Sequence, residues 1–79
     1  MNTAYQYDPR KGLCMFDDGT VYTVREMVFL SRHDLSAEDL AAIHLVKRIF
    51  GAELDTHEPE RTDWLAAMGR RLVRESSQN

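Results

Sequence analysis

Three histidines are the residues of this chain best suited to metal binding, and their spacing argues against it. His33, His44 and His57 do not lie three or four residues apart, the spacing that brings two ligands to one helix face, and no compact ligand motif contains them. We therefore expect no metal site. His44 stands near Lys47 and Arg48 and is expected to be an exposed surface histidine.

The single cysteine and two adjacent aspartates are the remaining candidates for catalysis. Cys14 lies in an apolar run, where a thiol usually acts as a small buried hydrophobe, and no cysteine–histidine arrangement supplies the base that a nucleophile needs. Asp17 and Asp18 precede Gly19, an arrangement that turn formation explains. One cysteine allows neither an intramolecular disulfide nor a cysteine zinc site. The sequence thus favours a protein that is not an enzyme and holds no cofactor.

The basic residues are the next group with a recognisable chemistry. Arg70, Arg71 and Arg74, joined by Lys47 and Arg48, have the side chains that contact phosphates in nucleic-acid complexes. The formal net charge of −3, however, argues against a chain whose main task is to coat a phosphate backbone. A DNA-binding helix-turn-helix is also disfavoured, because the second predicted helix begins with acidic residues that phosphates would repel. A dimeric nucleic-acid-binding regulator is therefore the alternative function.

Aromatic and arginine side chains dominate the energetic centres of protein interfaces, and several here exceed what a small core needs. The residues expected to contact a partner are Phe29, Arg25, Arg32, Trp64, Arg70, Arg71, Arg74, Glu58 and Glu60. The leading function is a non-enzymatic protein-binding module, a small adaptor or inhibitor that docks on a larger protein or complex. Two alternatives are also possible: these side chains form a homodimer interface, or they only complete the core.

The length and acidic charge are similar in style to those of accessory proteins of phages and mobile elements, including inhibitors of host defence complexes. The likeness covers size and charge alone. The N-terminal residues lack a cationic start followed by an apolar segment, and the apolar runs of the chain are short, as in 27–30. We accordingly expect a small soluble, cytoplasmic protein that does not engage a membrane.

Two helix starts are marked by capping signals thirteen residues apart. Thr23 and Ser36 are each followed three residues later by a carboxylate, Glu26 and Asp39, which is the capping-box pattern. In such a box the hydroxyl accepts from the third helical amide, and the carboxylate accepts from the amide of the capping residue. The sequence therefore predicts a helix, a short turn and a second helix.

Helices are expected over about residues 24–32, 37–50 and 62–75, with 76–79 as a tail. The second should end at Gly51, the residue type expected just past a C-terminus. It is apolar over more than half its circumference, and only His44, Lys47 and Arg48 form a polar strip. We therefore expect it to be a central helix, covered from more than one side.

The first helix has two different faces. Val24, Met27 and Val28 share one face with Ser31 at about 100° per residue. Phe29 falls on another face, among arginines.

Strands are expected at about residues 3–7, 13–16 and 20–23, separated by turns over 8–12 and 17–19. Whether residues 1–7 form a strand is left open, so the sheet has two or three strands. A two-stranded hairpin is marginal in water and must pack on the helices that follow. The predicted fold class is α+β: an N-terminal antiparallel β-hairpin packed on three α-helices, in a single small domain over residues 1–79.

Overall fold

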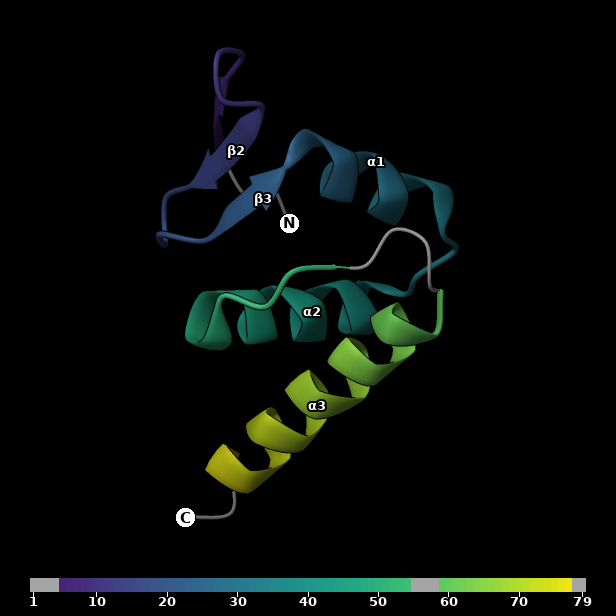
Figure 1. Cartoon of the computed structure of the whole chain (residues 1–79). Coiled ribbons are helices and arrows are strands. Elements are labelled where there is room, and N and C mark those ends of the chain that lie inside the picture. Colours follow the sequence, from purple (N-terminus) through teal and green to yellow (C-terminus); the bar gives the residue numbers. More distant parts are fainter. Residues whose placement is uncertain (1–4, 55–58, 78–79) are drawn as a thin grey trace.

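The predicted α+β fold is confirmed. The computed structural model describes residues 5–54 and 59–77, and Figure 1 shows its arrangement. The elements are β1 (Tyr5–Asp8), β2 (Leu13–Phe16), β3 (Val21–Thr23), α1 (Val24–Arg32), α2 (Ala37–Phe50) and α3 (Pro59–Ser77). The strands form one antiparallel sheet in the order β1-β2-β3, so the strand left open is present.

The element boundaries agree closely with the prediction, apart from α3. The first two helices cover the expected 24–32 and 37–50, whereas α3 begins at Pro59 and continues to Ser77. Proline suits the first turn of a helix, because its missing amide hydrogen would have no partner there. The expected strand 3–7 is observed from Tyr5 to Asp8, and residues 3–4 and 78–79 lie outside the described residues.

Both turns of the sheet form as their residue types predict. The Asp8 carboxylate accepts from the Arg10 amide at 3.0 Å, and Gly12 closes this turn at φ 64°. In the hairpin turn Gly19 has φ 90°, and the Asp18 carboxylate accepts from the Thr20 amide at 2.9 Å. The chemistry of each turn therefore accounts for the carboxylate that lies in it.

The capping box is complete at the start of α1 and only half formed at the start of α2. Thr23 accepts from the Glu26 amide at 3.0 Å and donates its own amide to the Glu26 carboxylate at 2.9 Å, so the first box is complete. Ser36 accepts from the Asp39 amide at 3.0 Å, but the Asp39 carboxylate pairs with Arg70 of α3. Aspartate is one methylene shorter than glutamate, and here it serves a tertiary contact.

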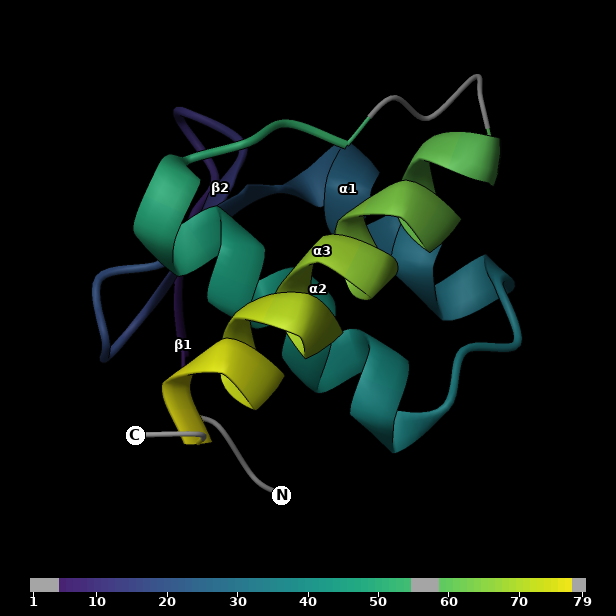
Figure 2. The ribbon, with the colours of Figure 1, turned by 90° about the horizontal axis from the view of Figure 1, so that it is seen from below.

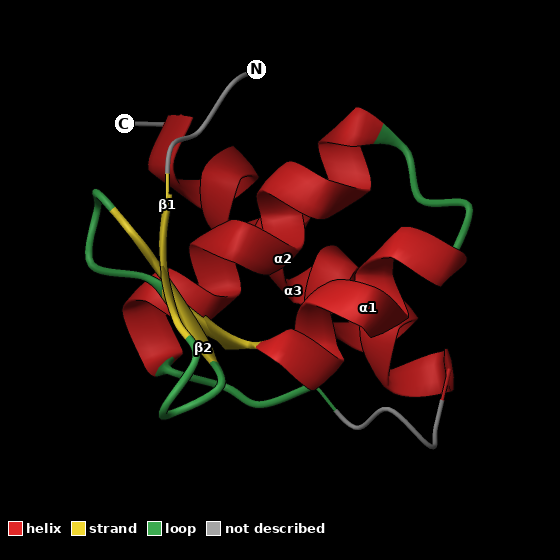
Figure 3. Ribbon diagram, turned by 90° about the horizontal axis from the view of Figure 1, so that it is seen from above, coloured by secondary structure: helices red, strands yellow, loops and turns green. Residues whose placement is uncertain are grey.

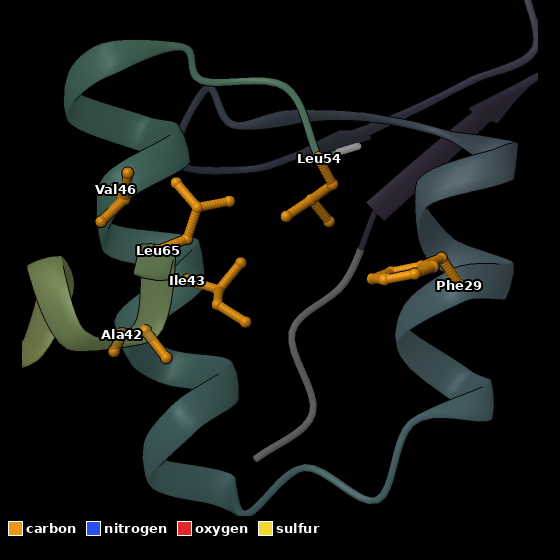
Figure 4. Packing of buried hydrophobic residues seen from close by; sticks show 7 residues of the cluster. Phe29, Ala42, Ile43, Val46, Leu54 and Leu65 are labelled. Carbon is orange, nitrogen blue, oxygen red and sulfur yellow. The ribbon is translucent and has the colours of Figure 1, made fainter. Parts of the chain in front are cut away.

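The molecule is layered around α2. In Figure 1 the sheet and α1 lie on one side of α2 and α3 lies on the other, and Figure 3 shows the sheet and α1 side by side. The main core cluster is Phe29, Ala42, Ile43, Val46, Leu54, Leu65 and Ala66. Figure 4 shows the labelled members of this cluster, which come from α1, α2, α3 and the segment after α2. The prediction of a central second helix is therefore confirmed.

The contact between α2 and α3 is a close crossing. Figure 2 shows α3 passing over α2 as an X, and Gly69 lies at this contact. A Cβ on Gly69 would lie 2.6 Å from the carbonyl carbon and 2.8 Å from the Cα of Ala42. Real Cβ atoms essentially never come so close to backbone, so glycine is required for the two helices to approach this far.

α1 packs on the core through the side that carries Phe29, a residue predicted to contact a partner. Phe29 is buried, with 7% of its surface exposed, whereas Val28 is 42% exposed. Glu26 and Phe29, one turn apart, face α2, while the Val24–Met27–Val28 side borders an open hollow. Glu26 lies on the inward side because Lys47 of α2 pairs with its carboxylate there.

No helix in the described residues is long and apolar enough to cross a membrane.

Candidate functional site

A buried ion pair joins α1 to α2. The Lys47 ammonium donates to the two Glu26 carboxylate oxygens at 3.0 and 2.8 Å, and both side chains are at most 5% exposed. Lys47 also donates to the Ala52 carbonyl, and the Leu54 amide donates to Glu26 at 2.7 Å. The expectation that Lys47 lies on an exposed polar strip was wrong, because a carboxylate on another helix satisfies its charge inside the protein.

The hydrogen bonds decide the charge state of Glu26. Burial by itself would raise the pKa of this carboxyl, but hydrogen bonds from Lys47, Thr23 and Leu54 hold the pKa below its ordinary value. Both carboxylate oxygens of Glu26 accept hydrogen bonds from groups inside the fold. We therefore regard this pair as structural, holding α1, α2 and the segment after α2 together.

A second polar chain connects the hairpin to α2. The His44 Nε2 lies 2.7 Å from the Asp18 carboxylate, and its Nδ1 lies 3.0 Å from the Tyr22 hydroxyl. A carboxylate only accepts, so Nε2 carries a hydrogen, and in the neutral ring Nδ1 accepts from Tyr22. The His44 ring also stacks on Tyr22 at 5.6 Å and meets the edge of Phe16 at 5.1 Å. His44 is half-buried in this cluster, so the expectation of a surface histidine was wrong.

An aspartate, a histidine and a hydroxyl in series also make up the triad of hydrolases. Here the hydroxyl belongs to Tyr22, which is only 3% exposed. Burial, together with the charges of Glu26 and Asp18, raises the pKa of Tyr22 above its ordinary value. A substrate cannot reach this hydroxyl and it does not ionise readily, so the chain Asp18–His44–Tyr22 serves to position the hairpin.

Asp18 should make the stability of the protein depend on acid pH. The adjacent Thr20 and then His44 hold the pKa of Asp18 well below its ordinary value, and the Thr20 amide makes the hydrogen bond to its carboxylate. A carboxyl whose pKa is lowered by folding stabilises the protein at pH values above its unfolded pKa of about 3.9. This contribution to stability is lost as the pH falls. We expect Asp18→Asn to lower the melting temperature at neutral pH.

The pH profile provides the check on this prediction. The difference in melting temperature between wild type and Asp18→Asn should be full above about pH 5 and shrink below the unfolded pKa. Asp17→Asn, at an exposed position next to Asp18, is the matched control and should change little. A pH-independent difference would mean that the lost interaction does not involve the Asp18 charge.

A groove of about 670 Å³ opens beside the crossing of α2 and α3. Its apolar lining consists of Ala41 and Ala42 from α2 with Ala67 and Val73 from α3. Val73 continues the stripe that Ala66 and Gly69 begin, yet it is 55% exposed, because α3 runs away from α2 toward its C-terminal end (Figure 1). An apolar stripe thus extends beyond the part of α2 that covers it.

Charged side chains line the same groove. Arg70, Arg71 and Arg74 come from α3, and Glu38 comes from α2. Three arginines and one glutamate give the lining a formal charge of +2, opposite in sign to the −3 of the whole chain. The groove therefore combines an apolar floor with a basic wall.

The groove arginines differ in how firmly they are held. Arg70 pairs with Asp39 across the two helices. Arg71 pairs with Glu75 at 3.1 Å on the same helix, with side chains that are 72% and 59% exposed. Arg74 forms no ion pair within residues 5–54 and 59–77. Arg71 and Arg74 are therefore available to an outside carboxylate at low cost, since exposed pairs contribute only about 0.2–1 kcal/mol.

A second hollow, of about 370 Å³, lies between the sheet and α1. Tyr5, Tyr7 and Cys14 line it from the sheet, and Met27 and Val28 line it from α1. The two tyrosines are 48% and 58% exposed, whereas Cys14 is buried. The face of α1 that carries Val24, Met27 and Val28 therefore borders this hollow and is not covered by another element of the described residues.

The residues predicted to contact a partner do not share one surface. Phe29 lies in the core against the His33 ring at 4.0 Å and is removed from the set, while Arg25 and Arg32 are exposed on α1. Trp64 is 53% exposed on α3 beneath Arg61, whose guanidinium carbon lies 5.7 Å from the ring centroid. Glu60 is exposed at the start of α3, and Glu58 lies outside the described residues. Of the eight that the structure describes, only Arg70, Arg71 and Arg74 line the groove.

Apart from Arg70, Arg71 and Arg74, the residues that line the groove were missed in the sequence, among them Ala41 and Val73. An alanine does not by itself indicate a binding surface, and the sequence pattern of α3 is compatible with Val73 as one more core residue. The available signal was that the apolar stripe of α3 reaches Val73 while the charged side chains around it become basic.

No group of three histidine, cysteine, aspartate or glutamate side chains gathers into a metal site in the described part of the chain. His33 donates its Nδ1 hydrogen to the Phe29 carbonyl at the end of α1, and His57 is outside the described residues. Comparisons with models of protein families, with curated proteins and with solved structures find no match. The function therefore has to be inferred from the geometry of this chain.

Proposed function

We propose that this protein is a non-enzymatic protein-binding module, a small adaptor or inhibitor that docks on a larger protein. The observation that carries the proposal is the groove between α2 and α3, where an uncovered apolar stripe ending at Val73 meets a basic wall. A concave surface with an apolar floor and a charged rim is typical of specific protein interfaces. The polar chain most like a catalytic one, Asp18–His44–Tyr22, supports this choice, since its hydroxyl is buried.

The alternative, a nucleic-acid-binding regulator, loses part of its basis. It relied on Lys47, which is buried and paired with Glu26, so this ammonium cannot reach a phosphate. Arg70 pairs with Asp39 across the two helices, so the basic side chains left for phosphates are Arg48, Arg71 and Arg74, which make a small footprint. Protein binding uses both the apolar and the charged parts of the groove, whereas phosphate binding would leave the apolar floor unused.

An affinity purification from the lysate of the cell of origin tests the proposal. The tagged chain is run with and without nuclease, at low and at high salt, and any retained protein is identified, purified and mixed back with the chain. We expect a defined complex to re-form from the pure components and to survive both treatments. Recovery of nucleic acid alone, lost at high salt, would instead support the regulator.

A further inference from the structure

We infer that the groove between α2 and α3 binds an acidic amphipathic helix of the partner protein. This inference rests on the proposed function and adds to it the chemistry of the bound segment. The contacts that define the segment are an apolar floor formed by Ala41, Ala42 and Val73, and a basic wall that includes Arg71 and Arg74.

The floor fits a helix. Helices pack at axis distances of about 8–10 Å, and small side chains at the contact give the shorter distances. Ala41 and Ala42 on α2 and Ala67 on α3 are all small, so another backbone can approach both helices closely. Val73 projects beyond the crossing and offers the groove a large apolar side chain, 55% exposed. The apolar side chains of a helix, repeating three and four residues apart, match such a stripe.

The wall selects an acidic helix. Carboxylates on the flank of the bound helix meet Arg74, which has no ion-pair partner in the described residues, and Arg71, whose exposed pair with Glu75 exchanges easily. Arginine can bind a carboxylate through two parallel hydrogen bonds, which adds orientation to attraction. Asp39 keeps Arg70 in place across the two helices, so the groove is already formed before binding.

A synthetic peptide provides the direct test. The probe is a helical peptide with leucines repeating at i, i+3, i+4 and i+7 and glutamates on its flanks; its control carries lysine in place of every glutamate. Binding is followed by backbone amide chemical shifts of the folded protein, which detect weak binding and locate it. We expect shifts centred on Ala41, Ala67, Val73 and Arg74 with the glutamate peptide, and much weaker binding of the lysine peptide.

Matched charge reversals give the second arm. Arg74→Glu should weaken binding of the glutamate peptide by about tenfold or more, as expected when an interface charge is reversed. Arg25→Glu, an equal charge change at an exposed position of α1 on the other side of α2, should leave it unchanged. Ala41→Glu adds both bulk and a carboxylate to the floor and should also weaken it. All three positions are exposed, and unchanged melting temperatures would confirm intact folds.

Several outcomes would overturn the inference. These are no shifts at the highest soluble peptide concentration, shifts centred on another face, equal binding of the lysine peptide, or equal binding by Arg74→Glu. The purified natural partner separates this failure from that of the proposed function. A partner that binds Arg74→Glu and Ala41→Glu as tightly as wild type leaves the protein-binding function in place and removes the groove as its site.

Discussion

Replacing Lys47 with methionine should cost about 3–5 kcal/mol of unfolding free energy, the loss typical when one partner of a buried ion pair is removed. Methionine keeps most of the side-chain volume but leaves the Glu26 carboxylate, 5% exposed or less, without its cation. The measurement is chemical denaturation at neutral pH. Lys11→Met removes the same charge at an exposed turn position and should change stability by at most about 0.5 kcal/mol.

The pH dependence distinguishes a lost ion pair from lost packing. The pKa of Glu26 is lowered in the folded protein from an ordinary value of 4.5, so its contribution is present above that value and is lost as the pH falls. Without Lys47 the penalty of burying a charge remains, and it disappears when Glu26 takes up a proton. Burial without Lys47 favours the protonated carboxyl, so the stability gap between wild type and Lys47→Met should begin to narrow above pH 4.5 and continue to narrow as the pH falls below it. A constant gap, or one equal to that of Lys11→Met, would contradict a buried pair in solution.

Gly69→Ala should destabilise the protein by about 1–3 kcal/mol, even though alanine is the better helix former. The added Cβ would lie 2.6 Å from the Ala42 carbonyl carbon, and backbone cannot move aside as a side chain can. α2 and α3 would have to separate, which also opens the contact that buries Leu65 and Ala66. Thermal and denaturant unfolding measure the loss.

Two further variants test the cause. At an exposed helix site, glycine to alanine gains about 1 kcal/mol, and Ala67→Gly, two residues away, should show the corresponding loss. Adding Ala42→Gly to Gly69→Ala should not restore stability, because the blocking atoms are backbone. Rescue by Ala42→Gly, or stabilisation by Gly69→Ala alone, would contradict the close crossing.

The crossing also explains why the groove exists. Helices that pack side by side would bury the whole apolar stripe of α3, whereas crossing helices touch over a short stretch and then diverge (Figure 2). Gly69 lies at the contact, and Val73, one turn further, is already uncovered. The same geometry thus forms part of the core and leaves the surface on which the proposed function rests.

The sequence by itself determined the local structure. Thr23 and Ser36 mark where α1 and α2 begin, and Gly51, at φ 62°, ends α2 where it was expected to end. These signals are reliable because caps and turns are satisfied by atoms within a few residues of one another, so the sequence contains both partners. The α+β class followed from them.

Only the tertiary structure decided which faces are inside. Lys47 is buried because a carboxylate 21 residues earlier in the chain meets it, and Phe29, on the same inward side of α1 as that carboxylate, lies in the core. The sequence pattern of α1 shows an apolar face but cannot show that a charged residue on another face has a buried partner. Val73 likewise is exposed because of where α3 crosses α2. In each case the deciding atoms are distant in sequence, and burial depends on which distant groups the fold brings together.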